Sequence, residues 1–309
     1  MHTSKVFITG INGFVGRNLR PYLAKAFDIG CISRKGKTGG LTYTQFLEEP
    51  MPYDAIIHLA GKAHDLKKTS LDSDYFEVNF ELTKRLYNQF LQSDAETFVY
   101  ISSVKAAADC VAGVLTEEVV PNPVTAYGKS KLMSENYILA HLPTDKKVYI
   151  LRPCMIHGPS NKGNLNLLFS IVSKGFPWPL GAFENQRSFL SIENLCFVIQ
   201  ELLENKTIPT GIYNVADDVP LSSNALIDLI ASSQKRKARI LTMSPRLLTM
   251  IARIGDFLHL PLDSERLQKL TENYVVSNVK LVSAVGKPLP VSSEEGLRRT
   301  FESFKGLGV

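Results

Sequence analysis

The feature that most constrains the fold is a regular alternation of short apolar runs and helical patterns over the first half of the chain. Strands are predicted at 5–9, 29–33, 55–59, 97–102 and 147–152, and helices at about 14–26, 75–92 and 126–142. Apolar strands that alternate with helices are typical of a parallel sheet buried on both faces. The sequence therefore predicts an α/β fold with a doubly wound parallel sheet.

Three glycines, Gly10, Gly13 and Gly16, follow the first predicted strand and open the first predicted helix. One glycine permits a tight strand-to-helix turn, another lets the backbone approach a pyrophosphate, and the third allows close packing of helix on strand. The first helical turn, with Phe14 and Val15, offers unpaired N–H groups to an anion. The spacing is G-x-x-G-x-x-G rather than G-x-G-x-x-G. We expect a dinucleotide-binding domain of the Rossmann type.

The second predicted strand ends in Ser33, Arg34 and Lys35. An NAD site usually places Asp or Glu near this position to bind the ribose hydroxyls. Arginine and lysine pair instead with a 2′-phosphate, so the sequence favours NADP(H) over NAD(H). The alternative is a solvated basic loop.

The chain changes character after about Pro159, where Gly, Pro and Asn become frequent and the later elements are mainly helical. We expect residues 1–160 to form the dinucleotide-binding domain and residues 161–309 a smaller substrate-binding region. Residues 185–217 are expected to return to the first domain.

Composition narrows the classes of partner. The net charge of +5 is mild and the basic residues are scattered, which gives little support to nucleic-acid binding but suits an anionic small molecule. No stretch approaches 18 uninterrupted apolar residues and no apolar signal region precedes the first strand, so we expect a cytoplasmic protein without membrane insertion. The four cysteines are far apart, and we expect no metal site.

Five motifs occur in order along the chain: TGINGFVG, IIHLAGKAH, YISSVKA, YGKSK and LRPCMIHGP. Together they resemble the extended short-chain dehydrogenase/reductase superfamily, and more narrowly its NAD-dependent epimerase/dehydratase family of nucleotide-sugar epimerases, dehydratases and 4-keto reductases. The resemblance continues through 185–195, 211–230 and 287–304, so it covers most of the chain.

The resemblance assigns several residues to the cofactor. It implies that Leu59, Ala60 and Gly61 pass close to the ribose or pyrophosphate and that Pro153 borders the nicotinamide. It also implies an indirect role for Asn79, which organises the central helix.

Tyr127 and Lys131 lie one turn apart in the predicted helix 126–142 and so share a face. Hydride transfer at a sugar carbon requires a proton to move at the hydroxyl oxygen, and tyrosine is a poor base unless a cation lowers its pKa. The resemblance implies that Lys131 also binds the nicotinamide ribose. Ser102 and Ser103, 25 and 24 residues before Tyr127, are both placed to polarise the substrate oxygen, and the family pattern favours Ser103.

Three further residues are expected at the substrate. Arg187 matches a family arginine that contacts the nucleotide, and Asn164 matches an amide near the diphosphate; arginine suits phosphate geometry. A surface salt bridge is the alternative for Arg187. Lys105 stands where many family members carry part of a Val-Tyr-Gly stretch, and it either contacts substrate or is solvated.

Two activities compete. The favoured one is a 4-keto reductase, in which NADPH reduces a UDP-linked, N-acetylated 6-deoxy sugar and Tyr127 donates the proton. The alternative is a 4-epimerase of UDP-glucose or a UDP-N-acetylhexosamine, against which the missing acidic residue after the second strand counts.

Two other interpretations rank lower. Dehydratases of the family carry an Asp-Glu pair where this chain has Val104 and Lys105. A non-catalytic, cofactor-sensing regulator ranks lowest, because Tyr127 and Lys131 are both present. Homodimers are common in the family, and the helices 75–92 and 126–142 would then form the interface.

Overall fold

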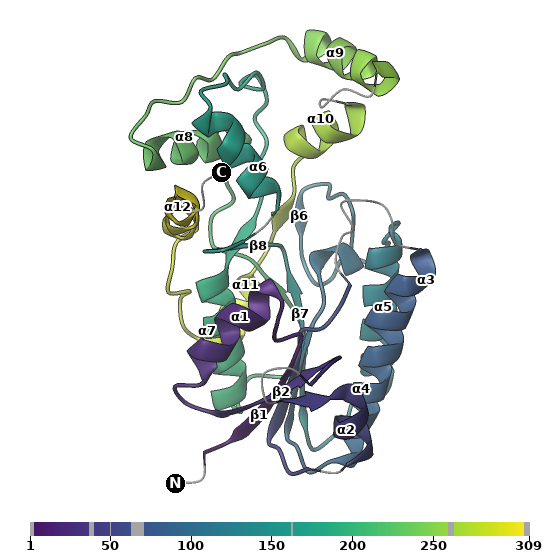
Figure 1. The fold of residues 1–309 in the computed structure, drawn as a ribbon. Coiled ribbons are helices and arrows are strands. Elements are labelled where there is room, and N and C mark those ends of the chain that lie inside the picture. The colour runs from purple at the N-terminus through teal and green to yellow at the C-terminus, as the bar shows by residue number, and fades with distance from the viewer. Residues whose placement is uncertain are drawn as a thin grey trace.

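The computed structural model describes residues 3–36, 40–49, 51–62, 71–161, 163–258 and 263–305. A seven-stranded sheet in the order β10-β7-β5-β4-β1-β2-β3 runs through the larger part of this chain (Figure 1). Every neighbouring pair of its strands is parallel. The strands are β1 (Lys5–Thr9), β2 (Asp28–Ser33), β3 (Leu41–Thr42), β4 (Ala55–His58), β5 (Thr97–Ile101), β7 (Lys147–Pro153) and β10 (Gly211–Val215). The predicted doubly wound parallel sheet is confirmed.

Helices cover both faces of the sheet. Successive side chains of a strand point to opposite faces, so apolar strands need cover on both. In β1, Ile8 packs into one apolar core and Phe7 into the other. The first face is covered by α1 (Phe14–Leu23), α7 (Ile192–Glu204) and α11 (Val279–Val285), and the second by α2 (Tyr43–Glu48), α4 (Leu82–Gln92) and α5 (Ala126–Ala140). The sheet is thus buried on both sides, as its apolar strands require.

A smaller, mainly helical region lies beyond the sheet (Figure 1). One apolar cluster holds Phe169, Ile230 and Phe301, and a second holds Trp178 and Leu248. Its helices are α6 (Asn164–Ser173), α8 (Ser223–Ser233), α9 (Pro245–Leu258), α10 (Ser264–Thr271) and α12 (Ser293–Phe304). Short parallel pairs connect the parts: β8 (Met155–His157) with β9 (Phe189–Ser191), and β6 (Val114–Leu115) with β11 (Val275–Val276). Helix α7 and strand β10 lie with the sheet although they follow α6 in sequence.

The helix predicted at 75–92 is divided into three consecutive segments. These are α3 (Asp72–Tyr75), the π-helical segment η2 (Phe76–Glu81) and α4. Asn79 is fully buried within η2. Single π-helical turns inside α-helices are frequent at functional sites. The predicted helix is confirmed over 75–92. Its π-helical turn was not predicted, because a single wide turn leaves the apolar periodicity of the sequence almost unchanged.

A buried ion pair ties helix α5 to strand β7. Arg152 Nη2 lies 2.6 Å from Glu135 Oε2, and Arg152 Nε donates to both carboxylate oxygens at 3.0 and 3.2 Å. The two side chains are 2% and 0% exposed. Ser102, just beyond β5, donates its hydroxyl to Glu135 Oε1 at 2.5 Å. Since a buried charge without a partner is costly, this network holds α5 in one position against two strands.

We expect Glu135→Ala to lower the free energy of unfolding by about 3–5 kcal/mol, because it leaves the Arg152 guanidinium buried without its counter-charge. Denaturant unfolding followed by circular dichroism measures the change. The matched control is Lys269→Ala, which breaks the exposed pair with Glu265 (2.5 Å) and should cost only about 0.3–0.5 kcal/mol. Equal effects of the two substitutions would contradict a structural role for the buried pair.

Candidate active site

The strand order reverses between the neighbouring strands β1 and β4, and the segments that follow these two strands lie in close contact. The chain passes from β1 to β2 and β3 on one side and then crosses to β4 on the other. Such a switch point opens a crevice at the carboxyl ends of the strands, where α/β folds bind ligands. Gly10 follows β1 with φ of +69°, and a Cβ there would lie 2.8 Å from the backbone nitrogen of Ala60. Only glycine fits this position.

Helix α1 begins just beyond Gly10 with no side chain capping its N-terminus. Gly13 is the N-cap residue, its N–H donates to the Gly10 carbonyl at 2.9 Å, and the first turn holds no acidic residue. The N–H groups of Phe14 and Val15 therefore have no acceptor within the helix. An uncapped helix N-terminus attracts anions, so this turn, with Gly16 buried behind it, fits a pyrophosphate.

The end of β2 carries one buried and two exposed polar residues. Ser33 is 8% exposed, and its hydroxyl finds no hydrogen-bond partner among the described residues. Arg34 and Lys35 are exposed just beyond it. The two exposed cations fit a phosphate group that approaches from solvent.

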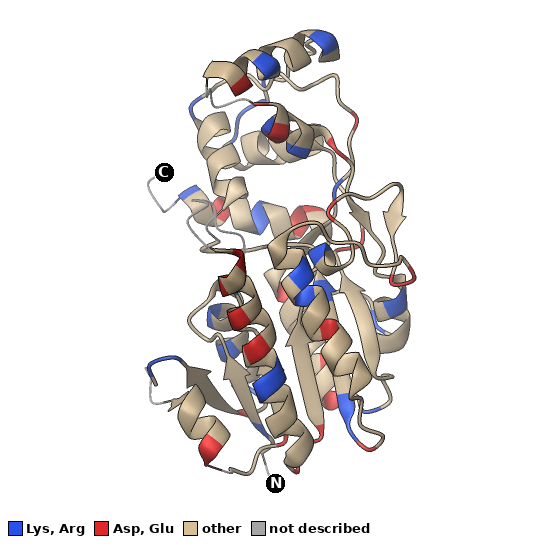
Figure 2. Cartoon of the chain, turned by 90° about the vertical axis from the view of Figure 1, so that its right-hand side faces the viewer, with Lys and Arg blue, Asp and Glu red and all other residues tan. Residues whose placement is uncertain are grey.

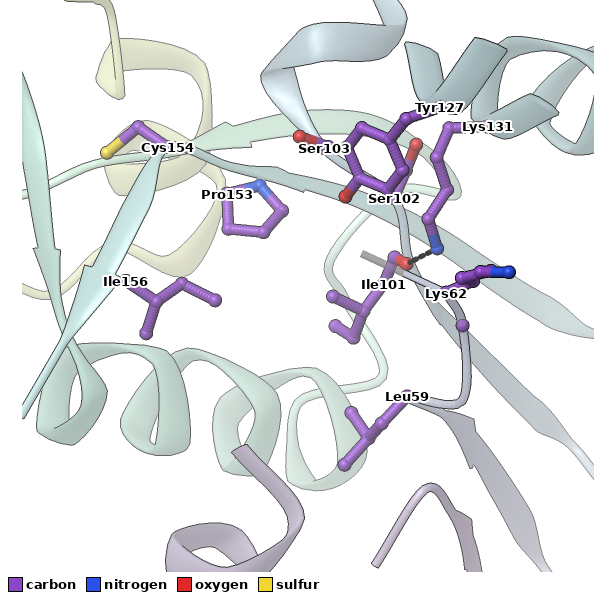
Figure 3. A pocket seen from close by; sticks show the side chains of 11 residues that line it. Leu59, Lys62, Ile101, Ser102, Ser103, Tyr127, Lys131, Pro153, Cys154 and Ile156 are labelled. Atoms are coloured by element: carbon purple, nitrogen blue, oxygen red, sulfur yellow. Dashed lines mark hydrogen bonds between the residues drawn. The ribbon is translucent and has the colours of Figure 1, made fainter. Parts of the chain in front are cut away.

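A cavity of about 200 Å³ lies at the carboxyl ends of β4, β5 and β7 (Figure 3). It is lined by Leu59, Gly61, Lys62, Ile101, Ser102, Ser103, Tyr127, Lys131, Pro153, Cys154 and Ile156. The cofactor and catalytic candidates from four separate segments meet here. The approach is close at Gly61, where a Cβ would lie 2.9 Å from Asn79 Oδ1 and 3.2 Å from Lys131 Nζ.

Tyr127 and Lys131 reach into this cavity from adjacent turns of α5 (Figure 3). Lys131 is 4% exposed, and its Nζ donates to the carbonyl of Ile101 at 2.8 Å and lies 4.8 Å from the centre of the Tyr100 ring. Burial lowers the pKa of Lys131 to about 8, against an opposing effect of the Glu135 carboxylate. The lysine is therefore a cation below that pH, one helical turn from the phenol.

Tyr127 is half-buried at the wall of the cavity. Burial raises its pKa above 10, a hydrogen bond with Ser103 acts in the opposite direction, and the neighbouring Tyr75 raises it further. The Tyr75 and Tyr127 rings stand edge to face with their centres 6.4 Å apart. Tyr127 is therefore protonated at neutral pH, the form that donates a proton.

The two candidate serines have different surroundings. Ser102 gives its hydroxyl proton to the buried Glu135 carboxylate. Ser103 precedes the short 3₁₀ segment η3 (Val104–Ala106), and its Oγ accepts the N–H of Lys105 at 3.2 Å. The Ser103 hydroxyl also interacts with Tyr127. Of the two, Ser103 has the geometry to act with the phenol on one substrate oxygen.

A hydrogen-bond chain through His58, which the motifs did not indicate, connects the phosphate turn with η2. The Thr83 hydroxyl donates to the Asn79 carbonyl, so it accepts the Nε2–H of His58 at 2.9 Å. His58 Nδ1 then accepts the Thr9 hydroxyl at 2.7 Å, and Thr9 Oγ1 accepts the N–H of Ala60 at 3.1 Å. Burial lowers the pKa of His58 to about 3, so the imidazole is neutral, as one donor and one acceptor require.

Asn79 fixes the segment that follows β4. Its Oδ1 accepts the N–H of Lys62 at 2.7 Å, and its Nδ2 donates to the Lys62 carbonyl at 3.1 Å and to Ser130 Oγ at 2.9 Å. Ser130 in turn donates to the carbonyl of Tyr127 at 2.8 Å. The asparagine thus connects the cofactor-lining segment with the start of α5.

The substrate candidates lie outside the lining of this cavity. Lys105 Nζ donates to the Asp109 carbonyl at 2.7 Å and lies 4.4 Å from the centre of the Tyr274 ring. Arg187 donates to the carbonyl of Lys269, lies 4.0 Å from Glu272 Oε1, and pairs through its backbone with Tyr274.

Burial lowers the pKa of both Lys105 and Arg187, and the charge of Arg187 lowers that of Lys105 further. Lys105 lies against the ring of Tyr274 and Arg187 pairs with its backbone, so the two cations lie near one another. Asn164, in contrast, is exposed as the first residue of α6. Among the described residues it makes no hydrogen bond with Lys105 or Arg187.

Comparison with known proteins identifies relatives across the whole chain. Residues 6–216 match the model of the NAD dependent epimerase/dehydratase family. UDP-glucose 4-epimerase of Vibrio cholerae is 26% identical over 318 residues, which cover 97% of this chain and 95% of that protein. GDP-6-deoxy-D-mannose reductase of Pseudomonas aeruginosa is 26% identical over 243 residues, which cover 74% and 80%.

Solved structures with the same fold contain either nicotinamide cofactor. UDP-glucuronic acid 4-epimerase from Bacillus cereus in complex with NAD superposes with a TM-score of 0.74 and 17% identity, over 98% of this chain and 99% of that one. RMD from Pseudomonas aeruginosa complexed with NADPH gives a TM-score of 0.73 and 22% identity, over 98% and 100%. At these identities the likeness shows a shared Rossmann-like fold.

We expect Ser103→Ala to lower kcat by about 10²–10³-fold, because it removes a hydroxyl that polarises the substrate oxygen, with little effect on unfolding. Ser102→Ala should instead leave kcat within a few-fold and lower the free energy of unfolding by about 1.5–3 kcal/mol, since its hydroxyl binds a buried carboxylate. Steady-state kinetics and denaturant titration of both variants measure these effects. The reverse pattern would give the catalytic role to Ser102.

Proposed function

Since the chain belongs to the NAD dependent epimerase/dehydratase family, we propose that it is an NADPH-dependent 4-keto reductase of a UDP-linked, N-acetylated 6-deoxy sugar. Its relatives are NAD-dependent epimerases and reductases of the extended short-chain dehydrogenase/reductase type. Those named for nucleotide sugars include the UDP-glucose 4-epimerase and the GDP-6-deoxy-D-mannose reductase. The proposal concerns the direction of hydride transfer, the cofactor and the sugar.

The observation that carries the proposal is the end of β2. Ser33, Arg34 and Lys35 stand where an NAD site usually has a carboxylate, and the Ser33 hydroxyl is buried without a partner among the described residues. A 2′-phosphate would pair with the two exposed cations, whereas ribose hydroxyls would find no acidic acceptor. NADPH is the usual donor for net reduction, and an epimerase returns the hydride that it removes.

The residues at the cavity have the chemistry for keto reduction. The bound dinucleotide would supply the hydride. Ser103 donates a hydrogen bond to the C4 carbonyl oxygen, and Tyr127, protonated at neutral pH, transfers its phenolic proton to that oxygen. The buried Lys131 cation stabilises the tyrosinate that results, and it is positive below about pH 8.

A 4-epimerase is the second candidate. Its support is the UDP-glucose 4-epimerase of Vibrio cholerae, which aligns with nearly the whole chain. In that reaction Tyr127 would first accept the proton of the C4 hydroxyl, and the keto sugar would turn within the site before reduction. A dehydratase is less well supported, since Val104 and Lys105 follow Ser103 in place of an acidic pair.

Two measurements separate these activities. The purified protein is denatured and the released nucleotide is identified, and oxidation of NADPH and NADH is then followed with a UDP-linked 4-keto-6-deoxy-N-acetylhexosamine. We expect NADPH oxidation with formation of the 4-hydroxy sugar. Stoichiometric release of NAD, together with interconversion of UDP-sugar epimers and no NADPH oxidation, would overturn the reductase in favour of the epimerase.

Tyr127→Phe removes only the phenolic oxygen and should lower kcat by about 10²–10⁴-fold, because the proton donor is lost. Cofactor binding, measured by fluorescence titration of NADPH, should stay unchanged. The control is Tyr22→Phe on the distal part of α1, which should leave kcat unchanged. Full activity of Tyr127→Phe would remove Tyr127 from the mechanism.

The combined substitution Arg34→Ala and Lys35→Ala should raise the KM for NADPH by about tenfold or more, because two charge-assisted contacts with the 2′-phosphate are lost. The KM for NADH should change little, since NADH lacks that phosphate. Lys25→Ala, which removes an exposed charge just beyond the C-terminal end of α1, is the control. An equal rise for both cofactors would show that the pair does not recognise the phosphate.

A further inference from the structure

Helix α9 presents an unpartnered apolar stripe at the end of the molecule farthest from the N-terminus (Figure 1). Leu247, Met250, Ile254 and Phe257 are spaced three, four and three residues apart and so lie on one face of the helix. Their exposed fractions are 41%, 54%, 48% and 83%. Leu258, 55% exposed, extends the stripe. Contiguous apolar surface of this kind marks an interaction site.

The opposite face of α9 packs against the rest of the C-terminal region. Leu248 and Ala252 are buried in the cluster that includes Trp178 and Leu267 of α10. The outer stripe is therefore held on a packed support, and its exposure is not a consequence of a detached helix. Helix α9 therefore has more apolar surface than its packing in the fold buries.

Positive charge accompanies the stripe. Arg246 and Arg253, seven residues apart, lie together along one border of it and are both exposed. In the cartoon of Figure 2, the blue of Lys and Arg positions marks the ribbon of the helix at this end of the molecule and the segment beside it. That segment carries the exposed cations Arg236, Lys237 and Arg239.

The acidic residue on this helix is already engaged. Asp256 accepts the N–H and the hydroxyl of Ser264 at 2.8 and 2.6 Å, which ties it to the start of α10. A second copy of the chain docked through the same face would place Arg246 and Arg253 of one copy near those of the other, with little acidic compensation. The charge pattern thus disfavours self-association through α9.

We propose that α9 docks the protein onto an anionic lipid surface, with its apolar stripe among the acyl chains and its arginines at the phosphate headgroups. This arrangement of an apolar face bordered by basic residues is that of helices that lie in the membrane interface. The helix has 14 residues and at about 1.5 Å per residue is about 21 Å long, less than the roughly 30 Å of a bilayer core. None of the described helices is long and apolar enough to span a membrane, so contact is peripheral.

The consequence is a reaction carried out at a membrane surface. Because α9 belongs to the C-terminal region, docking leaves the cofactor crevice at the sheet edge open to solvent. The proposal goes beyond the proposed function and does not depend on it, since neither the sugar nor the cofactor enters the argument.

The first experiment measures insertion of the stripe directly. The native chain has one tryptophan, the buried Trp178, so Phe257→Trp adds a reporter at the most exposed residue of the stripe. We expect a blue shift of its emission with vesicles of phosphatidylglycerol and phosphatidylethanolamine, and quenching by lipids brominated in the acyl chains. Val279→Trp, at a position 67% exposed on α11, is the matched control and should show neither effect.

The second experiment measures affinity by co-sedimentation of the full chain with the same vesicles. We expect binding that weakens by about tenfold or more in Met250→Ser with Phe257→Ser, because apolar burial is lost. Arg246→Gln with Arg253→Gln, or about 0.5 M NaCl, should weaken it similarly. Phosphatidylcholine vesicles should bind weakly. Val219→Ser with Val279→Ser, two other exposed apolar residues, should have no effect on binding.

The two experiments distinguish a lipid surface from a second copy of the chain as the partner of the stripe. Circular dichroism first confirms that each variant is folded. Absence of vesicle binding and of the Phe257→Trp blue shift would overturn the proposal. A native oligomer that dissociates in Met250→Ser with Phe257→Ser, without any lipid binding, would identify a second copy as the occupant and would also overturn it. Either result leaves the proposed reductase activity untouched, since turnover is measured separately in solution.

Discussion

The site depends on the hydrogen-bond chain that runs through the neutral imidazole of His58. One ring nitrogen binds Thr9 at the end of β1, and the other binds Thr83 on α4, so a single buried side chain connects two strands and a helix. Thr9 also holds the N–H of Ala60, which fixes the segment opposite Gly10. The crevice for the dinucleotide keeps its shape because every donor in this hydrogen-bond chain through His58 meets an acceptor.

A second buried network fixes the helix that carries Tyr127 and Lys131. Glu135 and Arg152 bind α5 to β7, and Ser102 extends the network to β5. The same helix carries Lys131, whose burial disfavours its charged form in the fold and lowers its pKa to about 8. A charge placed where burial penalises it is a common compromise between stability and activity. The ion pair one turn further along α5 supplies the rigidity that this placement needs.

Most of the architecture could be predicted from the sequence. The apolar runs identified the strands, because a doubly buried parallel sheet leaves a strong signal in the sequence. The glycine turn marked the start of α1. Residues 41–48, with β3 and α2, were missed since elements of two and six residues are too short to show a period. The π-helical turn at Asn79 was missed for the related reason that one wide turn barely alters the pattern.

The sequence by itself determined the fold class, and it brought the glycine turn and the Tyr127–Lys131 pair forward as candidates, because each of these is encoded by residues close together in the chain. Only the tertiary structure distinguished the two candidate serines. The Ser102 hydroxyl binds Glu135, 33 residues away in the sequence, whereas the Ser103 hydroxyl interacts with Tyr127. The same holds for the outer face of α9. Its apolar period is visible in the sequence, but which side the fold covers depends on α10 and Trp178, and periodicity cannot specify which partner a helix meets.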